Sequence, residues 1–440
     1  MSALRTAALR ANAARAAVPA GARSYATPSA AFSTADANGI KVASQDDGAQ
    51  TSSISLVIKA GSRYEPAPGV AHVLSNSLFK ATETRSQIRL VREAEALGGV
   101  LSSSLSREHL VLTAEFLKGD EAFFAEVLGD AIARAKFLPH EYTEEVVPQV
   151  QAEYEQSLRD LNVYAFDLAH QLAFRKGLGN SLFASPHVAV DQQAAVSFAK
   201  SAFTPANVAA FGSNIDSGKL AALVKDFVNL PAGGASSIST PQSQYYGGEV
   251  RVPASARVAR DQLVLAFKGA ARSEVDYSVL AFLLGGEPSV KWGQGASPLS
   301  KLARGSASAQ AFNLAYSDAG LFGISVSAPT HEVADVATKA VAELKQVAQG
   351  VNGDALKQAV NKAKFAAAAA YETRVGQVQL VGEQVATDGQ APSLEEVFVK
   401  LDKVSAESLA KAAKAALASK PTTVAVGDTH ALPYSDALGL

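Results

Sequence analysis

The sequence predicts an α+β fold in which one unit, a largely antiparallel sheet covered by helices, occurs twice. Two observations predict it. Short alternating strand patterns stand beside long helical patterns, and the same order of patterns returns 209 residues later. The chain has 440 residues, which is enough for two or three domains. Hydrophobic residues make up 48% and charged residues 19%, so each unit can bury a core of its own.

The first strong strand pattern covers residues 54–58, where Ile, Leu and Ile alternate before a turn that contains Lys59 and Arg63. The second half repeats it. Residues 263–267 alternate in the same way, and Lys268 and Arg272 stand 209 positions after the first pair. One such match is weak evidence, but it is followed by others in the same register.

Later elements keep nearly the same spacing. The strand pattern at 112–116 corresponds to 321–325. In the helical patterns at 121–136 and 333–349, positions 127, 131 and 132 correspond to 336, 340 and 341. A further helix that ends over 168–177 matches 380–389 at an offset of 212, which requires only three inserted residues. We therefore expect each half of the chain to be one copy of the same α+β unit.

The segment 231–246 (PAGGASSISTPQSQYY) separates the two copies. It combines glycine, proline, serine and threonine and has almost no hydrophobic pattern, as is typical of a linker. The predicted boundaries are therefore an N-terminal domain at 36–230, the linker, and a C-terminal domain at 247–440.

Composition excludes several classes of function. Forty Lys and Arg against 42 Asp and Glu give a net charge of -2, so nucleic acid is not an expected partner. The chain has no cysteine and one methionine, which excludes a disulfide, an iron–sulfur cluster, a thiolate zinc site and a nucleophilic thiol. No stretch is apolar over the roughly 18 residues that a membrane span requires.

The N-terminus is typical of a mitochondrial transit peptide. Its first 35 residues contain Arg5, Arg10, Arg15 and Arg23, no lysine and no acidic residue. The sequence around Arg23 predicts cleavage after Tyr25, so residues 1–25 are the expected transit peptide. A disordered alanine-rich tail is the alternative, whereas a secretory signal fits poorly because no apolar h-region follows the arginines.

One segment partly matches a phosphate-binding loop. Residues 212–220 (GSNIDSGKL) open a predicted helix, but five residues instead of four separate the glycines, and Leu220 stands where a hydroxyl is required. An ordinary strand–turn–helix junction, capped by Asp216 or Ser217, fits better.

Residues 69–82 (GVAHVLSNSLFKAT) resemble the motif helix of the pitrilysin-like peptidases, family M16, which include the mitochondrial processing peptidase. The family motif is H-x-x-E-H followed by Phe-Lys-Gly-Thr. The resemblance implies a LuxS/metallohydrolase-like, M16 fold, with two homologous domains of about 200 residues that face one another like a bowl.

In that family the two histidines bind zinc, the first glutamate activates water, and a second glutamate about 76 residues further on completes the metal site. Here His72 is kept and Glu153 stands at the expected spacing, but the motif reads His-x-x-Ser-Asn, with Ser75 and Asn76 in place of Glu and His. Serine is a poor general base and asparagine a poor zinc donor. The resemblance therefore implies four vestigial positions, with no catalytic residue, no metal and no cofactor.

Simpler interpretations of these residues exist. His72 fits a helix-start histidine that a backbone or Asn partner satisfies, and Glu153 fits a solvated or ion-paired helix residue. A new hydrolytic site built from Ser75, Asn76 and Glu153 would lack a base, nucleophile and orienting group. In the second copy Ala281 is the counterpart of His72, so we expect the helix at 277–284 to be simply core.

Two branches of the family lack the zinc motif. They are the noncatalytic subunit of the processing peptidase and the core proteins of ubiquinol–cytochrome c reductase, respiratory complex III. The mature length, the His-x-x-Ser-Asn motif and the stretches 153–176 and 203–209 resemble the core proteins more closely. The loop at 285–295 is interrupted by bulky residues such as Trp292, unlike the long glycine-rich loop of the peptidase subunit.

The core-protein branch implies a noncatalytic structural subunit needed for assembly and stability of complex III. It also implies a paralogous core protein, cytochrome b and cytochrome c1 as partners, and a peripheral position on the matrix side of the mitochondrial inner membrane. The alternative is a noncatalytic subunit of the processing peptidase that binds presequences.

Overall fold

The structure is a computed structural model that describes residues 32–187, 190–231, 238, 240–254, 260–286, 290, 293, 295–302 and 305–440. The compact unit formed by Phe32–Leu440 contains all the elements discussed below. The predicted transit peptide and Trp292 lie outside the described residues, as do parts of the predicted linker and of the loop at 285–295.

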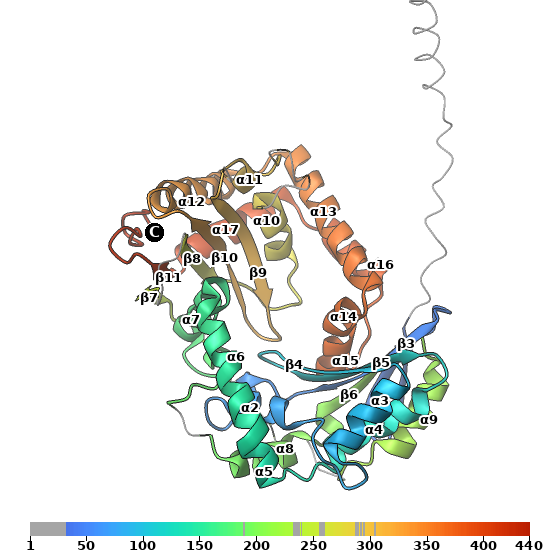
Figure 1. Cartoon of the computed structure of the whole chain (residues 1–440). Helices are drawn as coiled ribbons and strands as arrows, with labels where there is room; N and C mark the ends of the chain where they lie inside the picture. Colours follow the sequence, from blue (N-terminus) through green and yellow to red (C-terminus); the bar gives the residue numbers. More distant parts are fainter. Residues whose placement is uncertain are drawn as a thin grey trace, which may run out of the picture. The chain divides into compact units, whose positions relative to one another are not determined.

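A six-stranded sheet forms the core of the first half, in the order β1-β2-β6-β3-β5-β4 (Figure 1). Only the β2–β6 pair is parallel, so the sheet is largely antiparallel, as predicted. Its strands are β1 (Ser33–Ala37), β2 (Ile40–Gln45), β3 (Thr51–Ile58), β4 (Val100–Leu105), β5 (Leu110–Leu117) and β6 (Val208–Ser213).

Helices cover this sheet because their apolar faces require a partner surface. The helices of the first half are α2 (Val70–Ser77), α3 (Gln87–Ala96), α4 (Glu121–Ala133), α5 (Pro139–Glu141), α6 (Val147–Arg159), α7 (Leu161–Phe174), α8 (Gln192–Ala202) and α9 (Ser217–Phe227). Helix α7 is the exception, because it packs on the sheet of the second half. A π-helical turn over Tyr142–Val146 joins α5 to α6. The segment that partly matches a phosphate loop is the β6–α9 junction, where the Asp216 side chain accepts a hydrogen bond from the Lys219 amide at 3.0 Å. The strand–turn–helix interpretation is therefore confirmed.

The second half repeats this architecture with a five-stranded sheet, in the order β7-β11-β8-β10-β9. Again one pair, β7–β11, is parallel. The strands are β7 (Gly248–Pro253), β8 (Asp261–Lys268), β9 (Ser308–Ala315), β10 (Gly320–Ala328) and β11 (Thr422–Gly427). The helices are α10 (Asp276–Leu284), α11 (Pro298–Leu302), α12 (Val333–Gln349), α13 (Gly353–Glu372), α14 (Arg374–Gln377), α15 (Glu383–Asp388), α16 (Leu394–Asp402) and α17 (Ala406–Ala418).

The two sheets have the same strand order once β1 is set aside. Strands β2, β6, β3, β5 and β4 correspond in turn to β7, β11, β8, β10 and β9. The predicted repeats are realised as expected, because β3 and β8 carry the first matching pattern and α4 and α12 carry the matching helical pattern. The prediction of an α+β chain built from two such units is confirmed.

Each half contributes one helical segment to the sheet of the other half. Helix α7 packs on the second sheet, where Ala165 and Ala169 share a core cluster with Val264 and Val424. In the reverse direction, α14, a π-helical turn over Val378–Gly382 and α15 pack on the first sheet. Figure 1 shows α7 beside β8 and β11, and α15 beside β6. These two segments are the pair that the sequence matched at an offset of 212.

Buried charges connect the two halves where these segments meet. The Arg63 guanidinium donates to Glu108 Oε1 at 2.7 Å and forms a bidentate pair with Asp318, at 2.8 and 2.7 Å. Arg63 and Glu108 are almost completely buried. Arg272 stands 209 residues after Arg63 and is its counterpart in the second half. Its guanidinium donates to the Glu383 carboxylate at 2.8 Å. We refer to Arg63, Glu108 and Asp318 as the central ion cluster.

Candidate functional site

The motif helix α2 begins where only glycine fits. Gly69 adopts a φ of 87°, and a Cβ at this position would lie 2.6 Å from Cβ of Ala184. The Glu65 carboxylate then accepts a hydrogen bond from the Ala71 amide at 3.1 Å, which satisfies one free donor of the first turn. Together these contacts hold the start of α2 against the segment at residue 184.

His72 is buried in this position and has both ring nitrogens occupied. Its Nδ1 accepts a hydrogen bond from the Ala184 amide at 3.0 Å. Because Nδ1 is the acceptor, the proton of the neutral ring lies on Nε2, which donates to Oε2 of Glu153 at 2.6 Å. Burial lowers the pKa of His72, although the Glu153 carboxylate opposes that effect. The neutral ring is therefore the form that the site favours.

Glu153 lies on α6 and accepts hydrogen bonds from three side chains. Besides His72, the Asn76 amide donates to Oε2 at 3.0 Å, and Gln149 donates to Oε1 at 2.7 Å. Burial raises the pKa of Glu153, but the hydrogen bonds from Gln149, Asn76 and His72 outweigh it, so the pKa is lowered. The ionised carboxylate is thus held by its neighbours.

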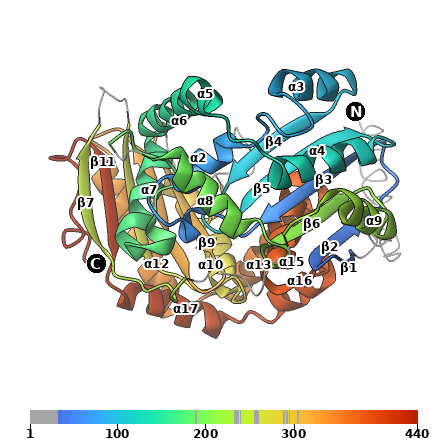
Figure 2. The ribbon, with the colours of Figure 1, turned by 90° about the horizontal axis from the view of Figure 1, so that it is seen from below.

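Ser75 points to a different neighbour from the other motif residues. Its hydroxyl lies 2.8 Å from the Ser103 hydroxyl on β4, and the Ser103 hydroxyl also donates to the Ser75 carbonyl at 3.3 Å. A serine nucleophile needs a base within hydrogen-bond reach, and Ser103 cannot act as one. The structure thus brings His72, Asn76 and Glu153 together and leaves Ser75 outside the group. Figure 2 shows α2 next to α6 and α8.

This arrangement leaves little capacity for a metal ion. One imidazole and one carboxylate are two candidate ligands, whereas catalytic zinc normally has three protein ligands and a water molecule. Both groups already satisfy each other by hydrogen bonding. Within the described part of the chain no three His, Cys, Asp or Glu side chains are grouped so that they would hold a metal ion.

Three contacts of this site were not predicted from the sequence. Gln149 was identifiable in principle, since it lies four residues before Glu153 on the same helix face. Ser103 and Ala184 carry no sequence signal, because a strand and a loop distant in sequence bring them to α2.

The counterpart of α2 in the second half is only partly core. Val279, Leu280, Leu283 and Leu284 are buried on α10, as predicted. The opposite face, which includes Ala281, lines a pocket of about 680 Å³. The expectation that this helix is simply core is therefore wrong for one face, because α13 and β9 leave a space beside it.

Comparison with known proteins assigns the family. Residues 41–185 match the family described as insulinase (peptidase family M16), and residues 189–363 match the peptidase M16 inactive domain. The chain is 44% identical to the protein named cytochrome b-c1 complex subunit 2, mitochondrial, of Cryptococcus neoformans over 93% of this chain and 94% of that protein. The chain belongs to peptidase family M16.

Two further relatives of this M16 chain carry the same name. The Neurospora crassa protein is 36% identical over 94% of this chain and 92% of its own length. The human protein is 28% identical over 91% of this chain and 90% of its own length. The domain type matched by residues 189–363 is described as inactive.

Among the helices that the structure describes, none combines the length and the apolar character needed to cross a lipid bilayer.

Proposed function

We propose that the chain is a noncatalytic structural core subunit of respiratory complex III, of the core protein 2 type, and is needed for assembly and stability of the complex. The observation that carries this proposal is the likeness to cytochrome b-c1 complex subunit 2 over more than nine-tenths of the chain. Relatives that share this name range from fungi to mammals. None of the relatives cited here is named a processing peptidase subunit, so the alternative is not favoured.

The site geometry supports a role without catalysis. His72, Asn76 and Glu153 form a closed hydrogen-bonded group, and Ser75 lies outside it. Such a group stabilises the packing of α2 against α6 but offers neither a base for water nor an open metal position. We propose that these four residues are the vestige of the family's zinc site and now serve only the fold.

The partners and location follow from the same proposal. A paralogous core protein 1, cytochrome b and cytochrome c1 would surround the chain, and it would lie on the matrix side of the inner membrane as a peripheral subunit. The arginine-rich segment at 1–25 supports import into mitochondria. We also propose two domains, 36–230 and 247–440, with 231–246 as the linker. The two sheets, which end at Ser213 and begin at Gly248, support this division.

The first experiment separates the structural role from the alternative. Native gels of inner membranes from cells that carry a tagged chain should show it migrating with cytochromes b and c1, and its depletion should lower the amount of assembled complex III. Recovery of the tagged chain in the soluble matrix, bound to a catalytic peptidase subunit, would contradict the proposal.

A second experiment tests the absence of catalysis. Cells in which Glu153→Gln replaces the normal chain should assemble complex III normally, because the amide oxygen still accepts a hydrogen bond from His72. The purified chain should not cleave presequence peptides, with or without added zinc. Cleavage that a chelator stops and Glu153→Gln abolishes would show that the site is active.

A further inference from the structure

The pocket beside α10 occupies the position in the second half that the vestigial site occupies in the first. The repeat offset of 209 relates His72 to Ala281 and Asn76 to Gly285, and the offset of 212 that holds for the later helices relates Glu153 to Phe365. All three second-half residues line the pocket, between α10, β9 and α13. In the first half, His72 and Asn76 each donate a hydrogen bond to Glu153, so no space remains between the three side chains. In the second half small residues replace two of them, and the space stays open.

The pocket also differs in charge from the group around Glu153. Glu153 is a carboxylate that accepts hydrogen bonds from three side chains, whereas Lys362 at the wall of the pocket is a cation. Lys364, two residues further along α13, pairs with Asp402 at 2.6 Å. Lys362 forms no such ion pair with any residue that the structure describes. An unpaired ammonium group at the wall of a pocket favours an anionic ligand, and a carboxylate is the common organic anion that it pairs with.

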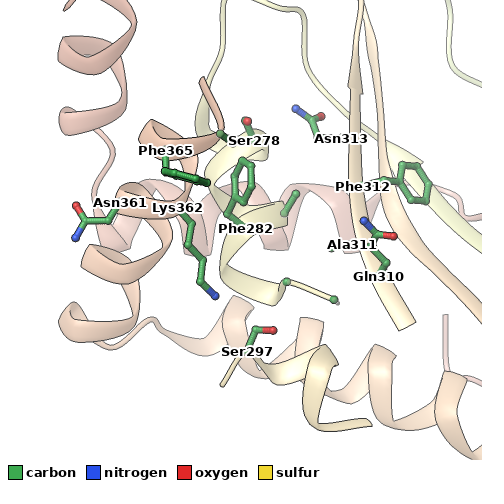
Figure 3. Close-up of a pocket in the computed structure, with 14 residues that line it drawn as sticks. Ser278, Phe282, Ser297, Gln310, Ala311, Phe312, Asn313, Asn361, Lys362 and Phe365 are labelled. Carbon is green, nitrogen blue, oxygen red and sulfur yellow. The ribbon is translucent and has the colours of Figure 1, made fainter. Parts of the chain in front are cut away.

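A second group in the pocket also lacks a partner. The side-chain oxygen of Asn313 on β9 is enclosed by protein and has no hydrogen-bond partner among the described residues. A ligand cannot reach that enclosed oxygen, but the nitrogen of the same side-chain amide lies toward the pocket and presents a hydrogen-bond donor to a ligand (Figure 3). A peptide amide carries both a donor and an acceptor, so it suits the Asn313 side chain in either orientation of its amide.

Two aromatic rings complete the lining. Phe282 of α10 is half-buried, and Phe365 of α13 is 76% exposed although it is a large apolar side chain. Figure 3 shows Lys362 and Asn313 reaching toward the pocket from its two walls, with Phe282 between them. An apolar side chain of a ligand would cover both rings, and a volume of about 680 Å³ suits a molecule of a few residues.

We infer that this pocket binds the free carboxylate end of an acylated amino acid or a short peptide with an apolar last residue. The carboxylate pairs with Lys362, an amide group of the ligand pairs with Asn313, and the apolar side chain lies against Phe282 and Phe365. An inorganic anion would leave the rings uncovered, and a fatty acid would leave Asn313 without a partner. This inference does not depend on the proposed role in complex III.

The test uses the full-length chain and two ligands that share this chemistry. Isothermal titration calorimetry compares N-acetyl-phenylalanine with the peptide N-acetyl-Ala-Ala-Phe, each as the free acid and as the uncharged C-terminal amide. We expect the free acids to bind at least tenfold more tightly than their amides. Tighter binding by the peptide acid would identify a chain end as the ligand, and equal binding would identify a small acylated acid.

Variants then test the named contacts. Lys362→Met should weaken binding of the free acid about tenfold, whereas Lys362→Arg should retain it, because both cations pair with a carboxylate. Phe365→Ser should also weaken binding. Because Phe365 is exposed, the melting temperature of this variant should equal that of the unchanged chain. Lys357→Met, an exposed lysine on the same helix outside the pocket, is the matched control.

Three results would overturn the inference. They are equal binding of the acids and their amides, equal loss of binding in Lys362→Met and Lys357→Met, and tighter binding of decanoate than of either acylated acid. The first two would show that Lys362 does not bind the carboxylate, and the third would identify a lipid pocket.

Discussion

At the scale of single residues, hydrogen bonds close the group around His72. His72 keeps its place on α2, but the Ala184 amide and the Glu153 carboxylate occupy its two nitrogens. Asn76 contributes a donor where the family has a metal-binding imidazole, and it stabilises the charge on Glu153. Hydrogen bonds therefore hold His72, Asn76 and Glu153 together in an arrangement that needs no metal.

Restoring the missing imidazole should restore metal binding. Asn76→His places a second histidine within reach of Glu153, so that three protein ligands surround one position. We expect about one zinc ion per chain after dialysis, measured by inductively coupled plasma mass spectrometry, and no peptidase activity because Ser75 remains. Asn229→His, on the surface, controls for weak binding by any added histidine. Stoichiometric zinc in the unchanged chain would contradict the closed-site interpretation.

Glu65 should make the stability of the fold depend on pH. Burial raises its pKa from 4.5 to about 7, although the amides of Ala71 and Gly69 oppose the shift. The folded state holds this proton more tightly than the unfolded chain, so the carboxyl stabilises the fold below about pH 4.5 and loses that contribution as pH rises through about 7.

The corresponding measurement uses Glu65→Gln. The amide oxygen can still accept the hydrogen bond from Ala71, and no charge is buried at high pH. At pH 8 we expect the free energy of unfolding in urea to rise by on the order of 2 kcal/mol relative to the unchanged chain, with little difference at pH 5. Glu155→Gln, at an exposed position, should change neither value. A difference that is independent of pH would refute this explanation.

At the scale of elements, the exchanged helical segments join the two halves, because each segment is buried against the sheet of the other half. The π-helical turn at Val378–Gly382 places Val381 against the first sheet, where it is fully buried. Gly382 lies closest, since a Cβ there would be 3.3 Å from a Val57 methyl and 3.6 Å from Cβ of Phe211. The space between the helical segment and the sheet therefore leaves little room for a side chain at position 382.

A larger residue at this contact should separate helix and sheet. Gly382→Val adds two methyl groups between closely packed elements, and overpacking of this kind costs roughly 1–3 kcal/mol. Chemical denaturation monitored by circular dichroism should show that loss. Gly353→Ala is the matched control, because no atom lies within 4 Å of its added Cβ, and its stability should change by less than about 0.5 kcal/mol. Equal effects of the two substitutions would rule out the packing explanation.

At the scale of the whole unit, the central ion cluster joins the two halves by buried charges. Arg63 comes from the first half and Asp318 from the second, and Glu108 also accepts hydrogen bonds from the Ser317 amide and hydroxyl. Glu108 and Ser317 stand 209 residues apart, so the repeat places corresponding turns of the two sheets against each other.

Removal of the shared cation should weaken the whole unit. Arg63→Met leaves Glu108 and Asp318 as neighbouring buried or half-buried acids without their main partner, and such a loss costs about 3–5 kcal/mol. Thermal unfolding should show the decrease, and Glu108→Gln in the same chain should recover part of it. Lys41→Met, which breaks an exposed pair with Asp36, should cost less than about 0.5 kcal/mol. If both variants lost the same stability, the buried central ion cluster would contribute no more than an exposed ion pair.

The sequence by itself determined the repeated architecture. Alternating apolar residues in β3 and β8, and the matching faces of α4 and α12, follow from local periodicity, which a single chain displays directly. The motif around His72 and its spacing to Glu153 also identified which residues form the candidate site. These features depend on local periodicity or on a known motif, so the sequence alone is enough to predict them.

Only the tertiary structure decided how these residues are used. The Ala184 amide, the exchange of α7 and α15 between the sheets and the central ion cluster all join segments far apart in sequence. The open pocket beside Lys362 likewise depends on the spacing of α10, α13 and β9. Periodicity shows which face of an element is apolar, but not which distant element covers it, because packing is settled by the shape and charge of both surfaces together.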